Sequence, residues 1–211
     1  MFKYVRKFTI NPLFFFCLAW IVLTDSTITL LCVLTSVFLH ECGHIFVYSL
    51  AHIVIDKIHL QPFGVRITVK NEAFILPHIQ LLCSMAGPLI NLVCAAVCFL
   101  LAKNTGMSQW VAMFYVTNIF LGIFNLLPIM PLDGSRILGA IVSVFFGEYT
   151  AQIVCAWVSL IVGLCVLVFG IYVLIDSKIN LSLCILAGYI LICLAVKIYN
   201  LLKKRTPNVK S

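Results

Sequence analysis

Long apolar stretches separated by short polar breaks run along almost the whole 211-residue chain. Many of these stretches contain about the 20 apolar residues that an α-helix needs to cross the hydrocarbon core of a bilayer. The pattern predicts an all-α polytopic membrane protein with about six transmembrane helices, at residues 11–24, 28–50, 76–102, 110–132, 151–175 and 181–202.

Residues 65–70 depart from this pattern, because apolar and polar side chains alternate along them. Alternation with a period of two is typical of a β-strand, and the helix breakers Pro62 and Gly64 precede it. We therefore expect a short membrane-associated β segment near residues 60–70, in the longest cytoplasmic loop.

The chain begins like a secretory signal peptide, with Lys3, Arg6 and Lys7 ahead of an apolar run. No small-residue cleavage site follows that run, so we expect the segment to remain as the first helix. We accordingly predict one intramembrane domain at residues 1–202 and a basic cytoplasmic tail at residues 203–211.

Composition and charge support the membrane assignment. Hydrophobic residues make up 63% of the sequence and charged residues 10%, whereas a soluble domain carries about 25% charged residues. With the N-terminus in the cytoplasm, all of the fourteen Lys and Arg except Lys103 and Lys178 fall on the cytoplasmic side. This asymmetry follows the positive-inside rule and places both termini in the cytoplasm. It also explains the net charge of +7 without a nucleic-acid partner.

Glu41 falls inside an apolar segment, where an ionisable side chain costs roughly 2.5–3.5 kcal/mol. It belongs to an H-E-x-x-H motif whose histidines are His40 and His44. Positions i and i+4 of a helix are one turn apart, so both imidazoles can bind one zinc ion. Glu41 then lies close enough to act as a general acid/base on a water molecule. The alternative is a pair of core histidines hydrogen-bonded to neighbouring helices, with Glu41 as their partner.

A catalytic zinc ion takes three protein ligands and a water molecule, so the motif needs a third ligand. Asp133, the second intramembrane acidic residue, follows Pro128 and Pro131. Two prolines three residues apart break a helix, and irregular backbone is tolerated at membrane depth only next to protein or a water-filled cavity. We predict Asp133 as the third ligand. It could also cap a helix that starts at Ser135, and the two interpretations are compatible.

The motifs H-E-x-x-H at residues 40–44 and N-L-L-P-x-x-P-L-D-G at residues 125–134 resemble those of the site-2 protease family of intramembrane zinc metalloproteases. Residues 60–64, residues 86–89 and the six-span layout are similar to this family as well. The resemblance implies one Zn²⁺ per chain, with the metal ligands His40, His44 and Asp133, the catalytic acid/base Glu41, and the substrate-binding residues Asn125, Pro131 and Asn91.

The chain departs from the family pattern at Cys42, where the family often has Leu, and at Ser135, where it has Gly. The sporulation branch of the family carries a nucleotide-binding CBS domain after its last span, and we do not expect one here. The short loop at residues 103–109 leaves no room for the PDZ domain of other branches.

By resemblance, the chain hydrolyses a peptide bond in or near the membrane segment of a membrane-associated protein. A substrate helix must become extended before cleavage, and the strand at residues 65–70 offers an edge for pairing. The resemblance further implies a pro-sigma factor as substrate, inhibitory membrane partners, and a location in the bacterial cell membrane or the membrane around the forespore. Elsewhere in the family the substrates are anti-sigma factors or signal-peptide remnants.

Two other classes of protein stay open. A zinc-binding membrane protein without proteolytic activity could retain client proteins through the same ligands, although an intact Glu41 argues against it. A metal or proton transporter would also place ionisable residues in the membrane. Transporters typically carry them on several spans and contain internal repeats, which this sequence lacks.

Overall fold

The computed structural model describes residues 7–10, 27–61, 64–69, 75–106, 108–177, 187–189, 191–196 and 198–199. The chain forms two compact units, residues 1–125 and residues 126–211, and we describe each by itself. The predicted first span at residues 11–24 and the predicted tail lie outside the described residues, as does half of the predicted last span.

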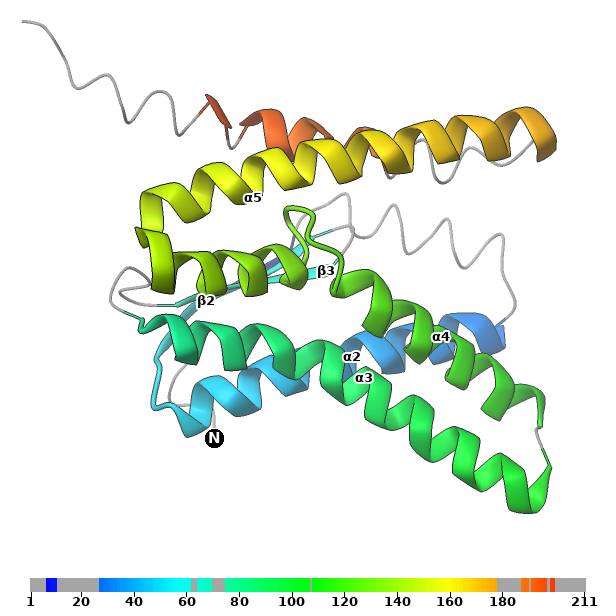
Figure 1. Cartoon of the computed structure of the whole chain (residues 1–211). Coiled ribbons are helices and arrows are strands. Elements are labelled where there is room, and N and C mark those ends of the chain that lie inside the picture. The colour runs from blue at the N-terminus through cyan, green and yellow to red at the C-terminus, as the bar shows by residue number, and fades with distance from the viewer. Residues whose placement is uncertain are drawn as a thin grey trace, which may run out of the picture. The chain divides into compact units, whose positions relative to one another are not determined.

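The described part of the first unit contains three helices, which pack against one another in pairs (Figure 1): α2 (Thr27–Leu50), α3 (Pro77–Thr105) and α4 (Gln109–Asn125). α2 and α3 approach closely at Gly43, where an added Cβ would lie 2.8 Å from the carbonyl oxygen of Ala86. Small residues allow this close approach between helices that cannot rely on water to drive them together.

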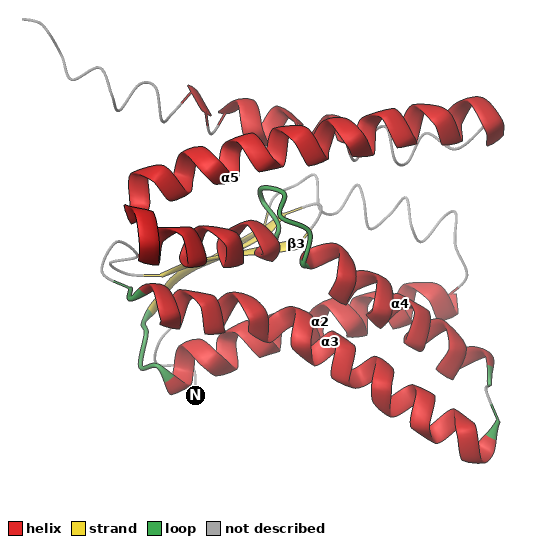
Figure 2. Ribbon diagram, in the orientation of Figure 1, coloured by secondary structure: helices red, strands yellow, loops and turns green. Residues whose placement is uncertain are grey.

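A three-stranded sheet completes the first unit, and Figure 2 draws its strands in yellow. β1 (Lys7–Ile10) pairs in parallel with β2 (Ile55–Gln61), which pairs antiparallel with β3 (Gly64–Val69). β3 confirms the strand predicted at residues 65–70. The order β1-β2-β3 places it at one end of the described sheet.

A small apolar cluster fixes the sheet to the helices. Tyr48 of α2 and Cys83 of α3 are buried together with Ile55 of β2 and with Ile67 and Val69 of β3. Burying apolar side chains of this size contributes roughly 1.5–3 kcal/mol each. The cluster thus joins the sheet to α2 one turn beyond the H-E-x-x-H motif.

The second unit contains α5 (Asp133–Ser177), which is two helical segments joined at Gly147. Gly147 has φ 79° and ψ 164°, a conformation that only glycine adopts readily, so the chain reverses there. The segments before and after it pack together, because the Cys155 thiol donates to the carbonyl oxygen of Ser135 at 3.3 Å. The reversal lies in the stretch between the fourth and fifth predicted spans, residues 133–150.

The predicted fourth span, residues 110–132, is wrong at its carboxyl end. α4 ends at Asn125, and residues 126–132 form a loop because Pro128 and Pro131 cannot continue a helix. Residues 133–146, which we did not assign to a span, form the first segment of α5.

Among the described residues, three helical stretches are long and apolar enough to cross a membrane: Thr27–Leu50, Pro77–Lys103 and Asp133–Asp176, the last of which includes the break at Gly147. α4 has 17 residues, the lower end of the range for a transmembrane helix. Large apolar side chains such as Phe38, Phe120 and Trp157 are exposed on these helices, as expected for surfaces that face lipid. The protein is an integral membrane protein, and the number of six spans stays a prediction.

Candidate functional site

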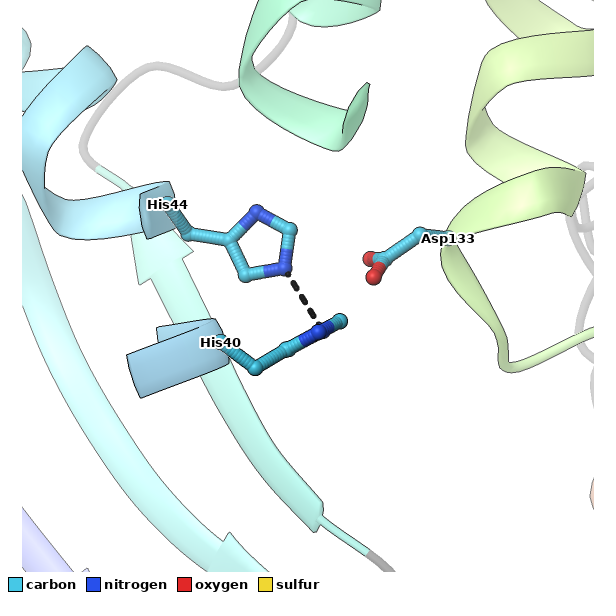
Figure 3. Close-up of side chains that lie close together, drawn as sticks. All are labelled: His40, His44 and Asp133. Carbon is cyan, nitrogen blue, oxygen red and sulfur yellow. Dashed lines mark hydrogen bonds between the residues drawn. The ribbon is translucent and has the colours of Figure 1, made fainter. Parts of the chain in front are cut away.

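The H-E-x-x-H motif forms one turn of α2, and both of its histidines are buried. Their imidazole rings lie edge to face, with centroids 4.8 Å apart. The Nε2 atom of His44 is 3.2 Å from the Nε2 atom of His40, as the dashed line in Figure 3 marks. The helical spacing of i and i+4 therefore brings the same nitrogen of both rings together.

Each imidazole is oriented by a hydrogen bond at its other nitrogen, Nδ1. The Nδ1 of His44 lies 2.7 Å from the carbonyl oxygen of Cys83, which can only accept. The Nδ1 of His40 lies 2.6 Å from Oδ1 of Asn91, which also accepts. Both Nδ1 atoms are therefore the protonated donors. In a neutral ring that carries its proton at Nδ1, Nε2 has the lone pair with which an imidazole binds a metal ion.

The separation of the two Nε2 atoms can be compared with that of two nitrogen ligands on one zinc ion. Two nitrogens at about 2.0–2.1 Å from one tetrahedral zinc ion lie about 3.3 Å apart. The observed 3.2 Å fits this arrangement. A hydrogen bond from the second ring nitrogen to a carbonyl or amide oxygen is also what orients metal-binding histidines in general.

Both imidazoles pack closely against α3 at Gly87. A Cβ added there would lie 2.7 Å from Nε2 of His40 and would overlap Nε2 of His44. Any side chain at this position would therefore displace at least one of the two rings. Gly87 belongs to the segment at residues 86–89, which we singled out in the sequence without this role.

Glu41 is half-buried on α2 between the two histidines, and its Oε2 atom is shielded from solvent. A carboxylate next to two metal-binding nitrogens is suited to exchanging a proton with a water molecule.

Asp133 is buried and begins α5 in the second unit. Its carboxylate lies in the first turn, where the helix dipole favours a negative charge. The helix begins two residues before Ser135, where we considered that it could start. The backbone amide of Ser135 donates to the carbonyl oxygen of Leu132. His40, His44 and Asp133 are the three buried side chains drawn in Figure 3, and each offers a ligand atom that zinc accepts.

The loop before Asp133 is fixed from within its own unit. The hydroxyl of Ser159, a fully buried residue of α5, accepts a hydrogen bond from the amide of Met130 at 2.9 Å. Gly134 packs against the same loop, because a Cβ there would overlap the carbonyl oxygens of Leu126 and Leu127. Asp133 is therefore held at the end of a constrained segment.

The structure places the three predicted substrate-binding residues differently. Asn125 is half-buried at the end of α4 and donates to the carbonyl oxygen of Leu121. Pro131 is exposed in the loop. Asn91 is fully buried and bonds His40, so it contacts a predicted ligand. Substrate binding by these residues stays a prediction.

Sequence reasoning missed two residues of this site, Asn118 of α4 and Ser36 of α2. Both are fully buried and are hydrogen-bonded to Asn91 or to each other. The available signal was the amide of Asn118 in the middle of an apolar span, where a polar group is expensive unless it is bonded.

The sequence of this chain is similar to those of known proteins. The model of Peptidase family M50 matches residues 101–170. A zinc metalloprotease of Methanocaldococcus jannaschii is 31% identical over 140 residues, which cover 64% of this chain and 40% of the relative. Stage IV sporulation protein FB of Bacillus subtilis is 29% identical over 135 residues, which cover 64% of this chain and 47% of the relative. The chain thus spans less than half the length of these curated relatives.

Among solved structures, the fold is similar to the site-2 protease from Methanocaldococcus jannaschii, with a TM-score of 0.68. That match covers 100% of this chain and 96% of the other, at 23% identity, and therefore concerns the fold. The resemblance predicted from the two motifs is confirmed: the chain is similar in sequence to M50 peptidases and similar in fold to a site-2 protease.

Proposed function

We propose that this chain is a zinc metalloendopeptidase that cleaves a membrane-associated protein in or near its membrane segment. The observation that carries the proposal is the pair of Nε2 atoms on α2, which lie 3.2 Å apart while the Nδ1 atom of each ring meets a hydrogen-bond acceptor. The relatives named zinc metalloprotease and the M50 match support the same chemistry. We assign the catalytic domain to residues 1–202.

In this proposal His40, His44 and Asp133 hold one zinc ion per chain. Zinc, when bound, polarises the scissile carbonyl group and lowers the pKa of an attacking water molecule. The carboxylate of Glu41 takes a proton from that water and delivers it to the leaving amide nitrogen, so the C–N bond breaks and one water is consumed. Asn125 and Pro131 help to hold the substrate backbone near the ligands.

The substrate must be extended where it is cut, since intrahelical hydrogen bonds shield the carbonyl groups of a helix. We propose that it pairs with β3, which ends the described strand order and adjoins the apolar cluster beside α2. Successive residues of a strand direct their backbone amides to opposite edges of the strand. Of the two variants Ile67→Pro and Thr68→Pro, therefore, only one removes a hydrogen-bond donor from the outer edge of β3. Because Ile67 is also buried, Ile67→Val and Thr68→Val serve as the matched controls.

The substrate class is proposed by extension from a relative. Stage IV sporulation protein FB carries sporulation in its name, and we extend that to a membrane-associated pro-sigma factor as the substrate class, with inhibitory membrane partners. From the positive-inside charge distribution we propose that both termini lie on the cytoplasmic side of the membrane. By extension from the same relative, this membrane is the bacterial cell membrane or the membrane around the forespore.

A substrate-independent experiment tests the proteolysis. Membranes from a bacterial host expressing the wild type or Glu41→Gln are compared by mass spectrometry of new protein N-termini. We expect N-termini in membrane-segment regions that appear with the wild type and are absent with Glu41→Gln at equal expression. Identical sets of N-termini would contradict proteolysis and favour the client-binding alternative.

A further inference from the structure

A buried chain of hydrogen bonds crosses three helices of the first unit and ends at His40. It starts at Asn118 of α4, continues through Asn91 of α3, and reaches Nδ1 of the imidazole on α2. Ser36, one turn before His40, contacts both amides. Three of these residues are completely buried and His40 is 5% exposed, so water does not compete with these bonds.

The direction of each bond follows from a backbone carbonyl at each amide. Asn118 Nδ2 lies 2.8 Å from the carbonyl oxygen of Phe114, which only accepts, so the NH₂ group faces that way and Oδ1 faces Asn91. Asn91 Nδ2 then donates to Oδ1 of Asn118 at 2.8 Å and to the carbonyl oxygen of Ser36 at 3.1 Å. The remaining atom of this amide, Oδ1, is therefore turned to His40.

The last bond selects one of the two neutral forms of the ring. Since Asn91 Oδ1 can only accept, the proton of His40 is on Nδ1 and the lone pair is on Nε2. If the Asn91 amide were reversed, its NH₂ group would meet Nδ1 and the proton would move to Nε2. The orientation of an amide on α3 thus decides whether His40 can bind a metal ion at Nε2.

We infer that Asn118 and Asn91 are positioning residues that set the tautomer of His40. Asn118 acts through Asn91, whose amide it holds together with the carbonyl oxygen of Ser36. We call the hydrogen-bonded pair Asn118 and Asn91 the relay. His44 needs no relay, because a backbone carbonyl oxygen accepts directly from its Nδ1 atom. The metal readout below rests on the proposed function, whereas the tautomer readout does not.

The tautomer is measured first, on metal-free protein labelled with ¹⁵N-histidine and held in detergent at about pH 8, above the usual imidazole pKa of about 6.5. Long-range ¹H–¹⁵N correlations distinguish the two forms, and a His40→Gln sample assigns the His40 signals. We expect the Nδ1–H form in the wild type and a mixture of both forms in Asn118→Leu. An Nε2–H form in the wild type would overturn the inference, whatever the fate of the variants.

Zinc affinity is measured next, by competition with a chromophoric chelator. Loss of a residue that orients a metal-binding histidine typically lowers affinity about 10–100-fold, and we expect this for Asn91→Leu and about 10-fold for Asn118→Leu. If Asn118 acts through Asn91, the double variant binds zinc as Asn91→Leu does. Additive losses, or unchanged affinity and tautomer in Asn118→Leu, would overturn the relay.

Thr117→Val is the matched control, because Thr117 neighbours Asn118 and its hydroxyl bonds the carbonyl oxygen of Met113 within α4. It should leave both readouts unchanged. The d–d absorption of cobalt-substituted protein separates the relay from general loosening. Asn91→Leu should shift the bands of the loaded protein, whereas a merely structural effect would lower only their amplitude. A wild type that binds no metal would refute the proposed function and leave the tautomer result to decide the relay.

Discussion

The Nε2 atoms of His40 and His44 lie 3.2 Å apart, and each ring is held by an acceptor at its Nδ1 atom. In the proposed function, this relationship prepares the two histidines of an apolar helix as a pair of metal ligands before a metal ion binds. Preorganisation of this kind lowers the cost of binding, because the side chains are already ordered.

Gly87→Ala should abolish zinc binding. The new Cβ would overlap Nε2 of His44 and approach Nε2 of His40 to 2.7 Å, so at least one imidazole must leave its position. Zinc content after metal-affinity-free purification measures the effect. Gly188→Ala is the control, because a Cβ at Gly188 meets nothing within 4 Å. Equal zinc content in both variants would contradict the predicted location of the metal ion.

Gly134→Ala, a change in the second unit, should weaken zinc binding by displacing Asp133. A Cβ at Gly134 overlaps two backbone carbonyl oxygens, so the backbone must shift next to Asp133. We expect at least the 10-fold loss of affinity that a misplaced ligand gives, measured by chelator competition. Gly139→Ala is the control, since its Cβ would make an ordinary 3.4 Å contact with the Cys155 sulfur. Wild-type affinity in Gly134→Ala would argue against Asp133 as a ligand.

Ser159→Ala should destabilise the second unit. The variant leaves the buried amide of Met130 without the acceptor that it has at 2.9 Å, at a cost of about 1–3 kcal/mol in the free energy of unfolding. Thermal unfolding in detergent reports the change. Ser143→Ala also removes a hydroxyl from α5, but that hydroxyl is half-buried and bonds a carbonyl oxygen of its own helix. A smaller loss of unfolding free energy in Ser159→Ala than in Ser143→Ala would show that the hydrogen bond from the Met130 amide does not hold the loop.

Removal of zinc should lower the stability of the wild type. A ligand present at 1,000 times its Kd stabilises the folded state by about 4 kcal/mol, and a chelator removes that contribution. The unfolding temperature with zinc and with excess chelator measures the difference. His44→Ala should show no such difference, because the variant has lost a ligand. The same shift in both proteins would mean that the stabilising ion binds elsewhere.

The helical fold and the H-E-x-x-H turn could be predicted because they depend on local sequence. Alternation of apolar and polar side chains predicted β3. The end of α4 was misplaced because hydropathy alone continues through residues 126–132, whereas Pro128 stops the helix. Local patterns identify apolar runs more reliably than the points where a helix ends within them.

The orientation of the histidines could not be predicted, because it depends on residues far apart in the sequence. His40 is separated from Asn91 by 51 positions, and Ser36 from Asn118 by 82. No periodicity within a helix indicates which polar side chain of a neighbouring helix will meet an imidazole. The unexplained presence of buried amides was the only available sign, and it did not specify their partners.

The most direct test of the central claim is the zinc content of the purified protein, measured in the wild type, Glu41→Gln and Asp133→Ala. The account predicts about one zinc ion per chain in the wild type and in Glu41→Gln, since Glu41 moves a proton and does not hold the metal. It predicts a clearly lower content in Asp133→Ala. A folded wild type that takes up no zinc from metal-replete medium would contradict the account.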